Sequence, residues 1–193
     1  MSDTTRPPTD ELTPEVDELT PEVDELTHDV EALRLRRIGT IHTPFADAVG
    51  TPIQSVYGDD AAGHVTIEPS FRGALADLDG FERIWLLYVF HRSKGWKPRL
   101  TPFRDTVERG LFATRAPRRP NPLGISLVRL HRVDLETGRL EVRDVDLIDG
   151  TPLVDIKPYI PEFDARPDSR AGWFDARRTA RVVADDRFSR DES

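Results

Sequence analysis

The chain has 193 residues and a formal net charge of −8. It contains no cysteine, which excludes disulfides, zinc–thiolate sites and thiol catalysis. It has no run of eighteen apolar residues and no basic start followed by an apolar stretch, so we expect a cytoplasmic protein without a membrane span.

Most of the negative charge lies at the N-terminus. Residues 1–33 hold eleven acids and one base, which leaves 24 acids and 26 bases for the remainder. Residues 11–31 read ELTPEVD, ELTPEVD and ELTHDVE, a seven-residue repeat in which Pro14 and Pro21 disfavour a continuous helix. We predict a disordered acidic tail over residues 1–35, with one possible helix at 27–36. A partner-binding or dimer-extending tail is the alternative.

A single domain is expected from residue 36 to residue 193. The segment IGTIHTPF (38–45) alternates and is β-branched, which predicts a strand that ends at Pro44. Residues 47–60 are rich in glycine, proline and aspartate and predict a loop. A second strand is expected at 64–69. Residues 71–81 carry leucines at helical spacing and predict a short helix or turn.

The second half of the domain also reads mainly as strands. The nearly continuous apolar run at 83–91 predicts a central strand buried on both faces. A glycine-containing turn at Thr137-Gly138 predicts a hairpin between its flanking strands. The predicted extended segments are 111–114, 125–136, 139–148 and 151–161, and residues 177–184 could form a strand or a helix. Six or seven strands with few short helices indicate a mainly β, single-domain β-barrel.

One loop concentrates positive charge. The window from Arg109 to Val133 has no acidic residue but six arginines. Three prolines inside it restrict the backbone, so the loop is stiff before a ligand arrives and loses little entropy on binding one. We interpret it as a surface for an anionic partner; a solvated surface loop is the alternative. The arginines are Arg109, Arg115, Arg118, Arg119, Arg129 and Arg132.

Four segments together resemble the TsaA-like proteins, which are the TrmO-type tRNA adenosine N6-methyltransferases. The segments are IGTIHTPF, FERIWLLYVFHRSKGW, FATRAPRRPNPLGISLVRL and DGTPLVDIKPYIP; they stand in family order and span roughly residues 36–165. The resemblance implies an S-adenosylmethionine-dependent enzyme on one β-barrel, working as a homodimer. Methyl transfer from a sulfonium demands no metal cluster, so we expect none. The implied substrate is the N6-threonylcarbamoyl adenosine next to the anticodon of tRNA, which gains a methyl group on N6.

The resemblance also implies residues that bind the cofactor, Arg115 among them. Arg118 and Arg119 lie on the same stiff loop but match no cofactor position, and from their charge we predict that they bind RNA together with Asn121. Methyl transfer needs alignment and a proton acceptor more than a strong nucleophile. The implied cofactor-binding residues are Pro52, Ile53, Gln54, His91, Arg92, Arg115, Leu127, Asp149, Gly150, Thr151 and Pro152.

Three residues are candidates for the proton acceptor, and the sequence does not choose among them. His91 ends an apolar run and could equally be a structural histidine. Asp149 precedes Gly150 and could instead cap a turn without touching a ligand. Tyr159 could lie at a plain strand end. The catalytic residue therefore stays open between these three.

Two other functions remain open. A non-enzymatic RNA-binding barrel could use the same arginines, although aromatic platforms at strand centres are not obvious. An S-adenosylmethionine enzyme could act instead on a small molecule. Cofactor binding separates the first from a methyltransferase, and nucleoside analysis of tRNA separates the second.

Overall fold

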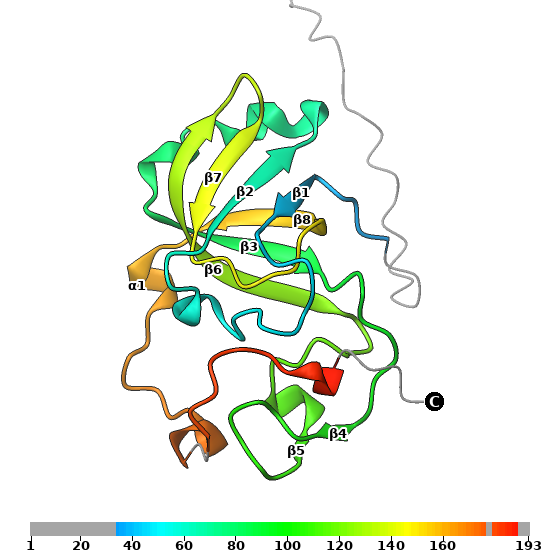
Figure 1. Ribbon diagram of the computed structural model, residues 1–193. Coiled ribbons are helices and arrows are strands. Elements are labelled where there is room, and N and C mark those ends of the chain that lie inside the picture. The colour runs from blue at the N-terminus through cyan, green and yellow to red at the C-terminus, as the bar shows by residue number, and fades with distance from the viewer. Residues whose placement is uncertain (1–33, 177–178, 189–193) are drawn as a thin grey trace, which may run out of the picture. The chain divides into compact units, whose positions relative to one another are not determined.

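The computed structural model describes residues 34–176 and 179–188, and its centre is a closed antiparallel barrel (Figure 1). The strand order around the barrel is β1-β2-β7-β6-β3-β8, and β8 pairs with β1 to close it. This confirms the predicted mainly β barrel. Its strands are β1 (Gly39–His42), β2 (Ala62–Ile67), β3 (Arg83–Val89), β6 (Leu123–Asp134), β7 (Arg139–Arg143) and β8 (Thr151–Pro158).

The other elements are short. A separate two-stranded sheet pairs β4 (Arg99–Leu100) with β5 (Arg109–Gly110), and α1 (Pro161–Asp164) is a single helical turn. Among the described residues, no helix has the length and apolar character to span a membrane. The 3₁₀ helices are Ser55–Tyr57, Pro69–Leu75, Leu78–Gly80, Leu111–Ala113, Gly172–Ala176 and Asp186–Phe188.

The barrel interior is built by period-two alternation. In β3, Ile84, Leu86 and Tyr88 point inward and are buried, whereas the residues between them are only partly buried. The prediction that this strand is buried on both faces was wrong. A barrel strand needs only one apolar face for the interior; the apolar residues on the outer face of β3 stay partly accessible.

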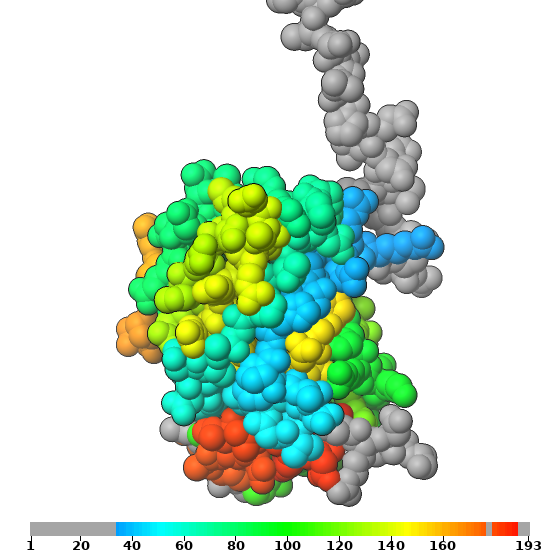
Figure 2. Space-filling view, turned by 45° about the horizontal axis from the view of Figure 1, so that its top comes forward, coloured from blue at the N-terminus to red at the C-terminus, as the bar shows by residue number. Residues whose placement is uncertain are grey.

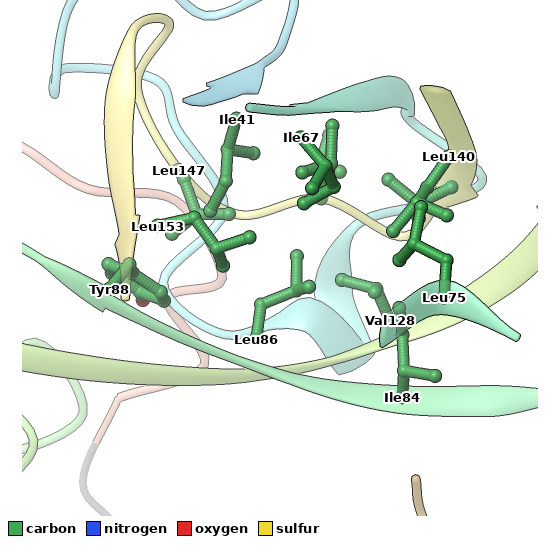
Figure 3. Packing of buried hydrophobic residues seen from close by; sticks show 13 residues of the cluster. Ile41, Ile67, Leu75, Ile84, Leu86, Tyr88, Val128, Leu140, Leu147 and Leu153 are labelled. Carbon is green, nitrogen blue, oxygen red and sulfur yellow. The ribbon is translucent and has the colours of Figure 1, made fainter. Parts of the chain in front are cut away.

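The core has two different ends (Figure 3). Leu75 packs beside Leu140 and closes one end, while Tyr88 and Leu147 lie at the other. Burying each large aliphatic side chain contributes about 1.5–3 kcal/mol, so this interior is the main source of stability. The polar groups discussed below lie at the Tyr88 end.

The β6–β7 hairpin confirms the predicted turn. Gly138 has φ 72°, which favours glycine, and the carboxylate of Asp134 accepts backbone hydrogen bonds from Glu136 and Thr137, each at 3.1 Å. The second strand ends at Arg143, earlier than expected. Asp144 adopts φ 67°, a left-handed conformation that does not continue a strand.

Two other expectations differ from the structure. Residues 111–114 are not extended, because the Leu111 carbonyl accepts hydrogen bonds from both the backbone N–H (3.0 Å) and the hydroxyl (2.8 Å) of Thr114 and closes a 3₁₀ turn. Residues 179–184 form neither helix nor strand; Val183 makes one isolated β-bridge with Pro52. The predicted tail and its possible helix lie outside the described residues, except for 34–36, which are irregular.

Candidate active-site cavity

A cavity of about 1220 Å³ opens at the Tyr88 end of the barrel. Its lining comes from segments that are far apart in the chain and meet only because the barrel closes. Drug-sized ligand pockets usually measure about 300–1000 Å³, so this cavity has room for a cofactor and part of a second molecule. The contributing segments are 47–49, 51–57, 85–93, 102–104, 112–117, 125–127, 146–148, Thr151, 171–174 and 184–188.

The C-terminal segment, residues 171–176 and 179–188, forms one wall of this cavity. Ala184 exchanges two backbone hydrogen bonds with the 50–51 loop, and Ile53 donates a third to Val182. Figure 2 shows the orange-red surface of this segment against the cyan surface of that loop. The wall is therefore built by a segment that follows the last barrel strand.

Aromatic rings cover much of the cavity. The indole N–H of Trp173 donates to the Ala113 carbonyl at 2.7 Å, and Phe103 meets Phe188 edge-on at 5.0 Å. The guanidinium of Arg104 lies 5.4 Å from the Tyr57 ring centroid, and its buried Nε has no hydrogen-bond partner among the residues that the structure describes. The lining thus offers flat apolar faces together with an unused donor, which suits a purine ring.

Eight of the eleven residues predicted to bind a cofactor line this cavity. Arg115 donates to the side-chain oxygen of Gln54 at 2.6 Å, which joins two of the predicted segments directly. Arg92 donates to the Ala46 carbonyl at 2.7 Å and so borders the same opening. The eight residues are Pro52, Ile53, Gln54, His91, Arg92, Arg115, Leu127 and Thr151.

The other three predicted residues lie on or beside the adjoining turn and not in the lining. The carboxylate of Asp149 accepts a hydrogen bond from the Thr43 backbone at 3.1 Å and lies 3.3 Å from a His42 ring nitrogen. Gly150 has φ 76° at the same turn, and Pro152 faces β1 in the ladder. The contacts of Asp149 are those of a turn cap, the alternative raised from the sequence.

The three candidate proton acceptors differ in position. His91 lines the cavity near solvent, and partial burial together with Arg92 lowers its pKa. The pKa of Asp149 is lowered, chiefly by the Thr43 backbone N–H. Tyr159 packs edge-on against Trp85 at 6.0 Å and is not among the lining residues. Of the three, only His91 borders the cavity.

A hydrogen-bonded chain that the sequence did not reveal lies in the cavity wall. Ser126 Oγ donates to Asp146 Oδ1 at 2.6 Å, and the Tyr88 hydroxyl lies 3.0 Å from Ser126 Oγ. Burial raises the pKa of Asp146 to about 6. The available signal was an acid placed between Val145 and Leu147, two residues that pack in the core. We call these three residues the Tyr88–Ser126–Asp146 chain.

The arginines of the acid-free window mostly contact the protein itself. Arg118 donates to the Phe188 carbonyl at 3.1 Å, and Arg119 donates to the Thr114 carbonyl at 3.0 Å. Arg109 pairs with Asp105, and Arg129 pairs with Asp144. Asn121 is exposed on the same loop. The predicted RNA contacts of Arg118, Arg119 and Asn121 stay a prediction, but two of the three side chains already have carbonyl partners.

Residues 40–165 match the model of the tRNA-methyltransferase O N-terminal domain. The chain belongs to this family. It is 48% identical over 140 residues to a probable S-adenosyl-L-methionine-binding protein of Pyrococcus abyssi, covering 72% of this chain and 75% of that one. It is 36% identical over 150 residues to the tRNA (adenine(37)-N6)-methyltransferase of Escherichia coli, covering 74% and 64%.

A solved structure has the same fold. The crystal structure of TrmO from Pseudomonas aeruginosa superposes with a TM-score of 0.61 at 36% identity, covering 73% of this chain and 62% of that chain. The chain therefore spans less than two thirds of the length of this structure and of the Escherichia coli relative. The matched family domain ends at residue 165, before the C-terminal segment that walls the cavity.

Proposed function

We propose that this protein is an S-adenosylmethionine-dependent methyltransferase that modifies N6 of the threonylcarbamoyladenosine next to the anticodon in tRNA. One observation carries the proposal: eight residues predicted to bind the cofactor come from separate segments and line one cavity. Family membership and relatives named for S-adenosylmethionine binding or tRNA methylation support it.

The cavity lining fits the chemistry of the cofactor. The methionyl carboxylate is an anion that Arg115 or Arg92 can bind, and the aromatic wall offers stacking faces for adenine. The buried Nε of Arg104 is a donor that still needs an acceptor. When bound, S-adenosylmethionine supplies an electrophilic methyl group on a sulfonium centre. The cavity-lining residues would hold the cofactor beside the substrate nitrogen and exclude water.

Cofactor binding gives the first test. In isothermal titration calorimetry with S-adenosylmethionine, Arg115→Ala should weaken binding by roughly 10–100-fold, the usual loss for a charge-assisted hydrogen bond. The matched control is Arg132→Ala, an exposed arginine of the same acid-free window that is not among the cavity-lining residues. Equal affinity in both variants contradicts the assignment of Arg115. Absence of binding in the wild-type protein favours the RNA-binding barrel.

Nucleoside analysis of tRNA gives the second test. A deletion strain should lack the N6-methylated threonylcarbamoyladenosine, and the gene supplied in trans should restore it. Purified protein with S-adenosylmethionine should add the same methyl group to tRNA from that strain. If the cofactor binds but every tRNA nucleoside is unchanged, a small-molecule substrate is the better assignment.

Two surfaces compete as the tRNA contact. One is the loop predicted from sequence, with Arg118 and Arg119. The other is the exposed loop after β3, which carries Lys94, Lys97 and a Trp96 that is 53% exposed. Lysines suit phosphates, and an exposed indole suits an unstacked base. This second loop begins at His91 and Arg92, both in the cavity lining, so its position fits RNA that enters the cavity.

Salt dependence separates these surfaces. Replacing both lysines with alanine should lower the slope of log binding constant against log salt by roughly 0.7–0.9 for each lost phosphate contact. The Arg118→Ala/Arg119→Ala protein should show the same effect only if those arginines leave their carbonyl partners to meet RNA. An unchanged slope in the double-lysine variant assigns the contact elsewhere.

We also propose that the protein is a homodimer. Phe112 is 81% exposed, and Leu123 and Ile125 on β6 are nearly half exposed, so apolar surface remains for a second copy beside the cavity that Phe112 and Ile125 also line. Sedimentation equilibrium should give twice the chain mass, and Leu123→Asp, outside the cavity lining, should reduce it to the monomer mass. A monomeric wild-type protein contradicts this proposal.

A further inference from the structure

The Tyr88–Ser126–Asp146 chain joins three strands or loops at one point of the cavity wall. Tyr88 comes from β3, Ser126 from β6 and Asp146 from the segment after β7. Tyr88 and Ser126 are 3% and 2% exposed, and all three residues belong to the cavity lining. A carboxylate, a hydroxyl and a phenol linked in this way are costly to place at the end of an apolar barrel unless each is satisfied.

We infer that Asp146 accepts the N6 proton of the substrate during methyl transfer, and that Ser126 and Tyr88 position its carboxylate. This inference rests on the proposed function. Asp146 touches the reacting atoms in this assignment, whereas Ser126 and Tyr88 act through it.

The step balances without a further reactant. The substrate N6 forms a bond to the methyl carbon while the carbon–sulfur bond breaks and its electron pair stays on sulfur. The N6–H bond breaks as well, its electron pair stays on nitrogen, and the proton moves to a carboxylate oxygen of Asp146. The products are the methylated substrate, a neutral thioether and a protonated carboxyl group that solvent later deprotonates.

The position of Asp146 distinguishes it from the three acceptors suggested by sequence. Asp149 is engaged with Thr43 and His42 on the adjoining turn, and Tyr159 packs against Trp85. His91 borders the cavity but is exposed at its edge. Asp146 lies in the cavity lining between the core residues Val145 and Leu147, and Ser126 holds its carboxylate by a hydrogen bond.

The surroundings of Asp146 make it a suitable base. Ser126 on β6 donates to its carboxylate, and the Tyr88 hydroxyl on β3 is hydrogen-bonded to Ser126 in turn. The Ser55 backbone N–H and the Arg115 guanidinium also favour the ionised form of Asp146. Burial is the larger effect and raises its pKa to about 6. Such a carboxylate is mostly ionised at neutral pH yet more basic than an exposed one, as general-base catalysis requires.

The test is Asp146→Asn in single-turnover methylation of threonylcarbamoyladenosine tRNA. We expect a loss of at least about 100-fold in the rate constant, as for removal of a general base. Calorimetry with S-adenosylmethionine should give an affinity within about threefold of wild type. Asp144→Asn, two positions away and outside the cavity lining, is the matched control and should keep the wild-type rate.

The pH profile supplies a second readout that a structural role would not move. The wild-type rate should rise with pH and level off above about pH 6, because only ionised Asp146 accepts the proton. Ser126→Ala removes a donor to the carboxylate, so it should shift this rise to higher pH. Tyr88→Phe keeps the ring and should shift it in the same direction by less.

The outcomes separate this inference from the proposed function. If the wild type methylates tRNA and Asp146→Asn stays within about threefold with an unchanged profile, the role of Asp146 is refuted while the proposed function stands. If the wild type methylates no tRNA, the proposed function fails and the inference fails with it. If Asp146→Asn does not fold, an unshifted profile in Ser126→Ala and Tyr88→Phe overturns the inference.

Discussion

The barrel and the lobe around the cavity are held together by different bonds. In the barrel, neighbouring strands exchange backbone hydrogen bonds around the whole circumference. The lobe comprises residues 46–57 and 91–122 with the C-terminal segment, and only short stretches of it pair through the backbone, such as β4 with β5. There, arginine side chains also donate to backbone carbonyls. The donor–acceptor pairs are Arg92–Ala46, Arg104–Arg181, Arg118–Phe188, Arg119–Thr114 and Arg187–Pro102.

This difference gives several arginines of the lobe a structural role. Irregular segments leave carbonyl groups without ladder partners, and a guanidinium can donate to one while its face stacks on an aromatic ring. Arg187 donates to the Thr101 and Pro102 carbonyls and lies 5.1 Å from the Phe103 ring centroid. Arginine therefore adds to the few backbone bonds of the lobe by satisfying its carbonyls, and an acid-free window need not mean an anionic ligand.

The largest predicted effect lies in the barrel. Leu86→Ala removes a fully buried side chain from the interior and should lower the free energy of unfolding by about 2–5 kcal/mol. Urea denaturation measures it, with Leu135→Ala, 54% exposed, as the control that should stay within about 0.5 kcal/mol. Similar values for the two variants would show that the barrel does not dominate stability.

The next effect lies where barrel and cavity meet. An added Cβ on Gly124 would be 2.2 Å from the Tyr88 ring, which is buried and cannot move away freely. Gly124→Ala should therefore cost about 1–3 kcal/mol by overpacking and should displace the phenol from Ser126. Gly73→Ala, with open space around its Cβ position, is the control. A crystal structure of Gly124→Ala with an unmoved Tyr88 contradicts the prediction.

Replacing Asp144 and replacing Asp146 should change the free energy of unfolding in opposite directions. Asp144 pairs with Arg129, which lowers its pKa; its contribution is present above the unfolded pKa and is lost as pH falls through the lower folded value. Burial raises the pKa of Asp146 to about 6, so the folded state loses stability as pH rises from about 4 to 6. At pH 7, Asp144→Asn should destabilise, whereas Asp146→Asn should stabilise by about 1–3 kcal/mol.

Urea denaturation between pH 3 and pH 8 checks both signs. The stability gain of Asp146→Asn should disappear below about pH 4, where the native carboxyl is protonated in both states. If Asp146→Asn is less stable than wild type at pH 7, Asp146 stabilises the fold. That result would contradict the prediction that its buried carboxylate lowers stability.

The smallest effect concerns one arginine, Arg187, which donates to the Thr101 and Pro102 carbonyls and pairs with Asp185. Arg187→Lys keeps the charge but loses the planar fork, so the C-terminal segment should open more easily by about 1 kcal/mol. Hydrogen exchange should rise in residues 179–188, while the barrel strands keep their protection. Arg170→Lys, at an exposed position, is the control. Equal loss of protection in the barrel would show that the two regions open together.

Local pattern predicted the barrel because most of its strands carry their own alternation, and β3 was found from its apolar run. The strands at 39–42, 62–67 and 123–134 were found this way, and the hairpin turn came from Thr137-Gly138. Family resemblance supplied eight of the cavity-lining residues. The bridge between Pro52 and Val183 was not predictable, because its partners lie at opposite ends of the domain without alternation around them.

The missed site residues have a common physical reason. Tyr88 lies in an apolar run and Ser126 lies in a regular strand, so each resembles an ordinary core residue until the sheet register brings them together. The partners of Arg118 and Arg119 are backbone carbonyls, which every residue carries and no sequence pattern marks. Side-chain chemistry alone therefore cannot separate an arginine that meets a ligand from one that completes the fold.

The C-terminal wall also sets the order in which the protein can mature during synthesis. All barrel strands are outside the ribosome once residue 158 has emerged from the exit tunnel. The cavity wall forms later, because it needs the residues around Val183. At about 5–20 residues per second, this leaves an interval of a second or more in which a closed barrel exists with an unfinished cavity. A nascent chain in that interval would be folded but not yet able to enclose a ligand.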